Sequence, residues 1–394
     1  MLVLLALAEL LGMSLWLAAN AIAPSLAARW GLSGTEVGGL TTAVQLGFVA
    51  GTAISAMLNL ADVWPSRVFF AGSAVCGAAA NALLIGADSY GTALATRFAT
   101  GMFLAGVYPP AMKMAATWFR ARRGFAVGTV VGALTVGKAT PYLVKALPGI
   151  SATTVVLAAS CCALLAAGMV GAAFREGPYP FPRRPFEWNL VATVFRQREW
   201  RLATGGYLGH MAELYSYWTW IPAFLAASAA VQLGSSTNDT LVELLSFGVI
   251  AVGGIGCLWG GLVADRIGRE KLVIRAMAAS GACALAVGFT FGKTWWVVAP
   301  IALAWGFFVI ADSAQFSVLV TESVPAHAVG TALTVQTSIG FLLTTLTIQL
   351  VPPVVDAVGW EWAFPMLAVG PALGIVSIQK LRGVRRRENA EGTE

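Results

Sequence analysis

Residues 206–224 read GYLGHMAELYSYWTWIPAF, and a segment near the start of the chain repeats part of this pattern. Glu213 precedes Trp220 by seven residues here, and Glu9 precedes Trp16 by seven residues there. Seven residues are close to two turns of an α-helix, so in each segment the carboxyl group and the indole share one helix face. Both acids lie inside long apolar segments, where an ionisable group usually faces a protein interior or a watery cavity. The two copies therefore predict a related pair of membrane-buried carboxyl groups.

The composition is that of an integral membrane protein. Of the 394 residues, 58% are apolar and 11% are charged, with a mean hydropathy of +0.75, whereas about 25% of the residues in a soluble domain are charged. The net charge of +6 does not indicate a nucleic-acid partner, because the basic residues lie between apolar segments and form no stripe on a soluble domain. Two histidines and five cysteines, with no ligand spacing among them, indicate neither a metal nor a cofactor.

Twelve apolar segments are long enough to cross a bilayer, which takes about 20 residues. We interpret the first as a span and not as a cleaved signal, because it has no basic n-region and many equally apolar segments follow. The predicted fold is therefore all-α and membrane-integral, with twelve transmembrane helices in two pseudo-symmetric six-helix halves. The predicted spans cover residues 1–28, 36–60, 66–87, 91–119, 124–147, 152–174, 202–231, 241–263, 272–292, 295–320, 331–351 and 361–379.

The long break after the sixth span sets the domain organisation. It begins with GPYPFPRRP, which cannot continue a helix. Its second part mixes aromatic residues with arginines, as an interfacial helix does, and an ordinary solvated linker is the alternative interpretation. We expect a first half at residues 1–174, a cytoplasmic linker at 175–201, a second half at 202–380 and a cytoplasmic tail at 381–394.

The basic residues predict the orientation. Cytoplasmic loops of membrane proteins carry an excess of Lys and Arg. Eighteen of the 25 Lys and Arg residues lie in the even-numbered loops and after the last span, at positions 67, 120–123, 175–201, 266–271 and 380–387. Both termini are therefore predicted to be cytoplasmic, in a multi-pass protein of a bacterial inner membrane.

Two loops at matching places in the halves carry related motifs. Residues 261–269 read GLVADRIGR, and the loop between spans two and three carries Asp62 and Arg67. At these residues the chain resembles the major facilitator superfamily, whose loop motif is G-x-x-x-D-R-x-G-R. The copy in the first half is degenerate, with Leu58 in place of the glycine. The matching residues of the complete copy are Gly261, Asp265, Arg266, Gly268 and Arg269.

The resemblance implies transport by alternating access, with the substrate site between the halves near the bilayer midplane. It also implies a cytoplasmic gate closed by ion pairs between basic and acidic loop residues. The basic cluster of Arg120, Arg122 and Arg123 could form such pairs with Asp62, Asp265 or Glu322. The alternative is that these charges only set the topology. Arg97 and Gly101 in the fourth span are similar to the family's R-x-x-x-G pattern.

Four titratable residues inside predicted spans are candidates for proton coupling. They are Glu213, Glu9, Asp312 and His210. A carboxyl group in a cavity between the halves could take up and release a proton as the cavity opens to either side. Glu213 is the first choice, because His210 lies one turn before it and aromatic residues follow it. The alternative is that each carboxyl group ties two helices together through hydrogen bonds.

A second set of buried polar and aromatic residues predicts a substrate site. Lys138 lies near the middle of the fifth span, where it could neutralise a substrate carboxylate or could pair permanently with Glu9 or Asp312. Tyr108 opens the sequence Tyr-Pro-Pro, which should kink the fourth span either for packing or to expose backbone carbonyls. The predicted substrate-binding residues are Lys138, Arg97, Tyr108, Trp16, Tyr215, Tyr217, Trp220 and Gln315.

These features predict a secondary active transporter, coupled to protons, that moves a small organic solute. Buried acids, buried bases and aromatic walls favour a zwitterion or a small carboxylate. A proton-antiporting efflux pump for amphipathic cationic drugs is the alternative, and a non-transporting sensor or assembly factor is the second. No nucleophile, base or metal cluster suggests an enzyme. The expected partners are the solute, protons and the lipid bilayer, and the expected state is a monomer.

Overall fold

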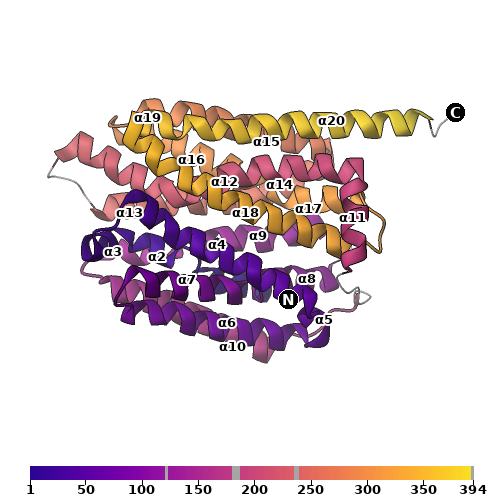
Figure 1. Ribbon diagram of the computed structural model, residues 1–394, viewed down its shortest axis with the longest axis horizontal. Coiled ribbons are helices and arrows are strands. Elements are labelled where there is room, and N and C mark those ends of the chain that lie inside the picture. Colours follow the sequence, from indigo (N-terminus) through magenta and orange to yellow (C-terminus); the bar gives the residue numbers. More distant parts are fainter. Residues whose placement is uncertain (120–122, 180–186, 235–238, 392–394) are drawn as a thin grey trace.

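The computed structural model describes residues 1–119, 123–179, 187–234 and 239–391 of the chain, and their regular structure is helical throughout. Figure 1 shows long helices lying roughly side by side in two groups, which are the early part of the chain in indigo to magenta and the late part in pink to yellow. The predicted all-α class is confirmed.

The helices fall into two groups separated by a short connecting helix. The first group comprises α1 (Leu2–Met13), α2 (Ala18–Ala21), α3 (Ala23–Trp30), α4 (Gly34–Met57), α5 (Leu60–Val63), α6 (Ser66–Ala82), η1 (Leu83–Gly86), α7 (Tyr90–Leu104), α8 (Tyr108–Trp118), α9 (Arg123–Lys145) and α10 (Ala152–Ala173). The connecting helix is α11 (Trp188–Arg196). The second group comprises α12 (Arg198–Leu233), α13 (Asp239–Ala251), α14 (Gly253–Ile267), α15 (Arg269–Val287), η3 (Gly288–Thr290), α16 (Trp295–Ala311), α17 (Ser313–Glu322), α18 (Val329–Val358), α19 (Trp360–Ala363), η4 (Pro365–Ala368) and α20 (Val369–Glu391).

Nine helical segments of the described residues are long and apolar enough to cross a membrane. The other three predicted spans are the first, fourth and seventh. The first is interrupted by turns at residues 14–17, and the fourth by turns at residues 105–107, directly before Tyr108-Pro109-Pro110. The seventh is the continuous helix α12, which contains the aromatic run 206–224. The kink predicted for the fourth span is therefore confirmed.

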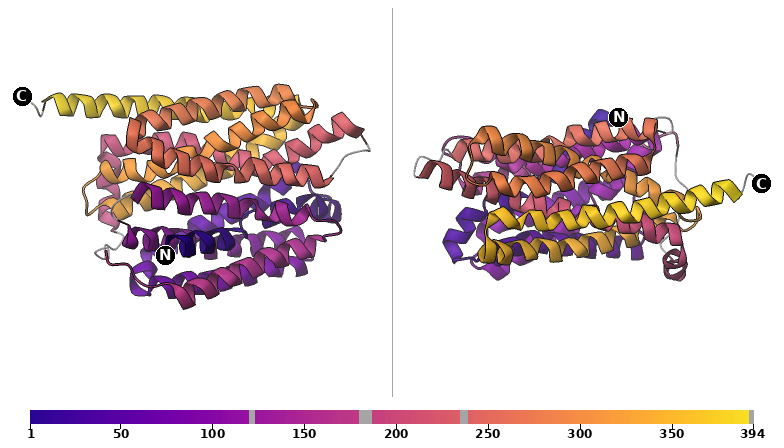
Figure 2. Two further views of the ribbon diagram at one scale, coloured as in Figure 1. Left: turned by 180° about the vertical axis from the view of Figure 1, so that it is seen from behind. Right: turned by 90° about the horizontal axis from the view of Figure 1, so that it is seen from above.

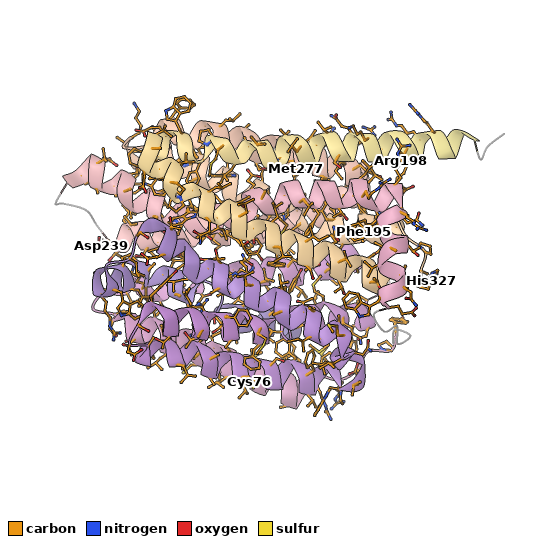
Figure 3. All side chains as sticks on the ribbon, viewed as in Figure 1. Cys76, Phe195, Arg198, Asp239, Met277 and His327 are labelled. Carbon is orange, nitrogen blue, oxygen red and sulfur yellow. The ribbon has the colours of Figure 1, made fainter. Side chains whose placement is uncertain are left out.

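The two ends of the bundle are distinct. In Figure 1, α11 stands across the helix ends on one side, which we call the linker end, and α3 and α13 mark the opposite end. Figure 2 shows from behind and from above that the C-terminal part of α20 projects past the bundle at the linker end. Figure 3 places Phe195 and His327 at the linker end and Asp239 at the opposite end.

Serine residues begin three first-group helices at the opposite end. Ser33 accepts a hydrogen bond from the backbone of Glu36, whose carboxylate accepts one from the Ser33 backbone in return. Ser89 and Ser151 start α7 and α10 in a similar way. A serine at this position satisfies backbone N–H groups that the helix leaves free. These caps set where the second, fourth and sixth spans begin.

Glycine allows neighbouring helices to touch along their backbones. A Cβ atom at Gly47 of α4 would collide with the carbonyl oxygen of Phe98, and one at Gly101 of α7 would collide with that of Val44. Small residues at helix crossings let membrane helices approach closely. The Gly101 position of the fourth-span motif is therefore explained by packing against α4.

The two groups meet where α9 packs against α13 and α14, and where α4 packs against α18. At the crossing of α9 and α14, a Cβ atom at Gly132 would lie 2.8 Å from the carbonyl oxygen of Gly254. At the crossing of α4 and α18, the side-chain amide of Gln349 contacts Oγ1 of Thr42 at 3.1 Å. We call the two groups the first half and the second half, since these crossings form a seam between them.

Candidate substrate and proton site between the halves

The ammonium group of Lys138 lies in a cage of aromatic rings at the seam between the halves. Lys138 comes from α9 in the first half, is only 1% exposed, and donates a hydrogen bond of 2.7 Å to the hydroxyl of Tyr215 on α12. Its nitrogen lies 4.0 Å from the ring centre of Trp16, 4.6 Å from that of Tyr215 and 4.5 Å from that of Trp218. Ring faces attract a cation electrostatically, and more strongly when water is excluded. The cage therefore stabilises a buried positive charge with residues of both halves.

Further aromatic rings extend the cage along the seam. Phe48 of α4 lies 5.2 Å from Trp16, and Phe341 of α18 lies 4.6 Å from Phe48 between ring centres. Tyr108, at the start of α8, lies 6.4 Å from Phe48. Aromatic pairs at these distances contribute about 0.5–1.5 kcal/mol beyond simple burial. The site is thus enclosed by rings from the first, second, seventh and eleventh predicted spans, next to the kink of the fourth.

Arg97 holds the broken segment of the first span that carries Trp16. Its guanidinium group donates to the backbone carbonyls of Leu15 at 3.1 Å and Trp16 at 2.5 Å, and to Oδ1 of Asn81 at 2.9 Å. A helix that breaks inside a membrane leaves carbonyl groups without partners, which costs several kcal/mol per group. Arg97 supplies the missing donors, so the structure places it behind Trp16 as a positioning residue.

Glu9 brings an acid close to Lys138 without forming an ion pair. The first-half helices α1 and α9 touch where a Cβ atom at Gly137 would collide with the carbonyl oxygen of Leu10, so the residues next to Glu9 and Lys138 are in contact. Within the described residues, neither carboxylate oxygen of the fully buried Glu9 has a hydrogen-bond partner. Both side-chain polar atoms of the buried Gln45 on α4 are also without a partner in this part of the chain. Buried polar groups without partners are rare and call for a functional explanation.

Glu213 lies in a different environment from Glu9, although the two sequence segments match. One oxygen of Glu213 accepts a hydrogen bond of 2.7 Å from the indole of Trp305 on α16, and the other accepts one of 2.9 Å from Ser280 on α15. All three residues belong to the second half and are buried. The carboxyl group therefore ties α12 to two neighbouring helices, as the alternative interpretation of the sequence expected.

His210 and Asp312 come together inside the second half. Nδ1 of His210 lies 2.9 Å from Oδ1 of Asp312, within ion-pair distance although not aligned for a hydrogen bond. Asp312 occupies the turn between α16 and α17, and the imidazole packs against the rings of Tyr207 and Phe316. Asp312 thus has a partner of its own, and Lys138 pairs with neither of the acids considered from the sequence.

Three other predicted substrate residues are buried in the second half, and two of them have hydrogen-bond partners outside the Lys138 cage. The hydroxyl of Tyr217 donates to the backbone carbonyls of Val249 and Ala302 within the second half. Trp220 donates its indole N–H to the carbonyl of Ile348 at 2.9 Å, which fixes it nearer the opposite end. Gln315 is buried on α17. The structure therefore brings together Lys138, Trp16, Tyr215 and Tyr108, with Arg97 behind them.

The motif between α14 and α15 lies where the halves meet at the linker end. A Cβ atom at Gly261 would lie 3.3 Å from the carbonyl oxygen of Gly124 on α9, and a Cβ atom at Gly124 would lie 3.8 Å from Oδ1 of Asp265. Gly268 starts α15 with a φ of +91°, which favours glycine, and Arg269 pairs with Glu322 at 3.1 Å.

The structure describes the side chains of only some of the remaining gate residues. Arg67 is exposed in the first turn of α6, and Arg266 lies in the last turn of α14, both at the linker end. Outside the described residues lie the side chains of Asp62, Arg120, Arg122 and Arg123. The predicted ion pairs between these loops stay predictions.

The predicted substrate-binding residues did not include Phe48, Phe341 and Trp218, which the structure places around Lys138. Trp218 could have been found, because it stands three residues after Tyr215 in the same aromatic run. Phe48 and Phe341 are single rings in apolar segments, and nothing in the sequence sets them apart from the other phenylalanines. Among the described residues, no group of three or more His, Cys, Asp or Glu side chains could hold a metal ion.

The architecture is that of an integral membrane carrier, with two helical halves and a charged, aromatic site between them. The chain belongs to the Major Facilitator Superfamily, whose family model matches residues 4–348. A crystal structure of a bacterial homologue of the human lysosomal transporter Spinster, in an inward-facing and occupied conformation, has the same fold with a TM-score of 0.68. It is 15% identical, and the match covers 98% of this chain and 96% of that one. A search of curated proteins found no match. The resemblance noted in the sequence is confirmed, and with it a multi-pass secondary transporter.

Proposed function

We propose that this transporter moves a small organic solute bearing a carboxylate, together with protons, and that the solute carboxylate binds Lys138. The observation that supports this is the surroundings of the Lys138 ammonium. It is buried at the seam and bound by one hydroxyl and three ring faces, and among the described residues it has no ion pair with a carboxylate. An ammonium group has three donors. A solute carboxylate would therefore supply the negative charge that the protein itself does not place there.

Glu9 is the proton site in this proposal. A solute carboxylate at Lys138 and an ionised Glu9 would repel each other across the contact between α1 and α9, and a proton on Glu9 removes that repulsion. The absence of donors to Glu9 within the described residues leaves its oxygens free to exchange that proton. Glu213, whose oxygens are both occupied, would instead stay a fixed link in the second half. The same buried cation disfavours an amphipathic cationic drug as the solute.

The orientation belongs to the proposal as well. The linker end carries most of the basic loop residues, so we place it in the cytoplasm of a bacterial cell, with the protein in the inner membrane. The domain boundaries at 174, 201 and 380 are part of the same proposal, although α20 continues as a helix to Glu391. The opposite end would then face outward.

Proteoliposomes loaded with a pH-sensitive dye test the proposal. Zwitterions, carboxylates and cationic drugs are added in turn to wild type, Glu9→Gln, Lys138→Met and, as the matched control, Glu213→Gln. We expect a solute-dependent pH change in wild type and in the control, after correction for the amount of folded protein. Glu9→Gln should retain solute exchange without the pH change, and Lys138→Met should lose solute exchange.

Two results would contradict the proposal. If Glu213→Gln abolishes the pH change while Glu9→Gln preserves it, the proton site lies in the second half. If Lys138→Met exchanges solute as wild type does, the carboxylate site lies elsewhere. Transport of cationic drugs alone would favour the efflux alternative, and a lack of any flux would favour a sensor.

A further inference from the structure

A cavity lies between the halves, nearer the opposite end than the Lys138 cage. Its volume is about 330 Å³, and α2, α3, α4 and α9 of the first half and α12 and α13 of the second half line it. Its walls are mostly apolar and include Val37, Trp220 and Val242. Lys138, Tyr142 and Lys145 follow one another at spacings of four and three residues on α9, so they share one helix face. That face leads from the cage to this cavity, over a rise of about 10 Å.

One ion pair closes the seam beside this cavity. Nζ of Lys145, the last residue of α9, lies 2.6 Å from Oε1 of Glu243 in the first turns of α13. The two side chains are 24% and 14% exposed. Of the ion pairs in the described part of the chain, this one alone joins the two halves. The halves cannot separate at this end without breaking it.

The polar atoms of the cavity wall show what a ligand must offer. Within the described residues, Oε2 of Glu243 and Oδ1 of the 9%-exposed Asn20 are buried acceptors with no donor. The amide nitrogen of Asn20 is already used, because it donates to Thr41 at 2.7 Å. Two free acceptors call for a donor group such as an ammonium. The Lys145 ammonium, once separated from Glu243, calls for an anion.

Once the ion pair is broken, only a solute with both charges supplies a partner to Lys145 and a partner to Glu243. A cation alone would pair with Glu243 and leave Lys145 partly buried without a partner, and an anion alone would do the reverse. Leaving one member of a partly buried ion pair alone is strongly unfavourable. A zwitterion replaces one internal ion pair with two intermolecular ones, so it opens this end at the lowest cost.

We propose that this cavity is an entry site for a zwitterion with an aliphatic side chain, and that Lys145 and Glu243 form a latch which the solute replaces. Asn20 and Glu243 bind the ammonium group, Lys145 binds the carboxylate, and the apolar wall contacts the side chain. This rests on the proposed function and narrows its substrate class from carboxylates in general to zwitterions.

The latch can be tested without any solute. Ser246 lines the cavity and is fully buried, so Ser246→Cys, in a variant whose five native cysteines are replaced, reports access by a membrane-impermeant thiol reagent in nanodiscs. Lys145→Gln and Glu243→Gln should each be labelled roughly tenfold faster than the parent, as expected when a coupling between the halves is removed. The double exchange Lys145→Glu with Glu243→Lys should restore the slow rate. Lys293→Gln, which removes an exposed lysine between the third and fourth predicted spans of the second half, is the control. Equal rates in all variants would overturn the latch.

The substrate class is tested in the same labelling assay with three matched probes. Leucine carries both charges, isoamylamine only the ammonium and 4-methylpentanoate only the carboxylate. Leucine should slow labelling of Ser246→Cys, and the two single-charge probes should not. The protection should be lost in Lys145→Gln but retained in Lys138→Met, because the central cage is a separate site. The zwitterion assignment would be overturned if a single-charge probe protected as well as leucine does, or if leucine did not protect. Neither result would decide the latch or the proton coupling, which are tested by their own experiments.

Discussion

Arg97 is a buried cation that donates to two backbone carbonyls and to the side chain of Asn81. Its contacts to the carbonyls of Leu15 and Trp16 compensate for the break in the first span, and its contact to Asn81 links it to α6. Both fixed residues of the R-x-x-x-G pattern in the fourth span, Arg97 and Gly101, thus have a structural role. Arg97 fixes the turn that presents Trp16 to Lys138, and Gly101 lets α7 approach α4.

Removing the Arg97 side chain should destabilise the whole protein. For Arg97→Leu we expect a loss on the order of 3 kcal/mol in the free energy of unfolding, because hydrogen bonds to a charged group are worth about 1.5–3 kcal/mol each and two buried carbonyls lose their donors. Arg97→Lys keeps the charge but not the planar fork, so its loss should be smaller. Thermal unfolding in detergent measures both. A Leu variant as stable as wild type would mean that the broken segment finds other donors.

At the scale of helices, α4 and α7 of the first half pack backbone against backbone at Gly47 and Gly101. Gly101→Ala should cost about 1–3 kcal/mol, because the added methyl group meets the backbone of α4 at Val44 and not a movable side chain. Gly168→Ala in α10 is the matched control, since no atom lies within 4 Å of its Cβ position. Alanine favours a helix over glycine by about 0.5–1 kcal/mol, so the control should be neutral or stabilising. Melting temperatures compare the two, and an equal shift in both would refute the packing argument.

Helix ends in the second half are joined by charges at the linker end. Arg385 of α20 pairs with Glu199 of α12, Glu270 of α15 and Glu322 of α17, at 3.0, 2.8 and 3.2 Å. Arg385→Gln should lower stability by about 1–2 kcal/mol, more than an isolated exposed pair contributes, because three acids lose one partner. The loss should shrink at high salt, which screens partly exposed charges. Arg387→Gln removes an exposed charge of the same helix as a control. Equal effects of the two substitutions would argue against the network.

For the molecule as a whole, the seam between α9 and α14 must loosen when the halves move apart at the linker end. Gly132→Leu should act as a wedge there, because even a Cβ atom would lie 2.8 Å from the Gly254 carbonyl oxygen. Spin labels at Phe125→Cys and Leu262→Cys, both exposed on opposite sides of this seam, should then show a longer distance. Gly248→Leu on α13, where no atom lies within 4 Å of the Cβ position, is the control. If the distance between the spin labels is unchanged in Gly132→Leu, loosening of the seam between α9 and α14 does not move the halves apart at the linker end.

The sequence by itself determined the features that depend on local chemistry. Apolar runs of the right length predicted the helices that cross the membrane, and the loop motif predicted the family. Proline has no backbone N–H, so the sequence Tyr108-Pro109-Pro110 predicted the position of the break in the fourth span. The short serine motifs at Ser33, Ser89 and Ser151 likewise act within one helical turn. None of these features needs a partner from elsewhere in the chain.

Only the tertiary structure decided which buried group meets which. Glu9 and Glu213 stand in nearly the same sequence, yet one has no donor in the described residues and the other has two, because their neighbours come from different helices. Helical periodicity tells which residues share a face, but it does not tell what that face meets. Lys138 therefore donates a hydrogen bond to Tyr215 and pairs with no acid of the described residues, and Lys145 forms an ion pair with Glu243, nearly a hundred residues away. The packing of two halves against each other created these pairs, and no segment of the chain contains them on its own.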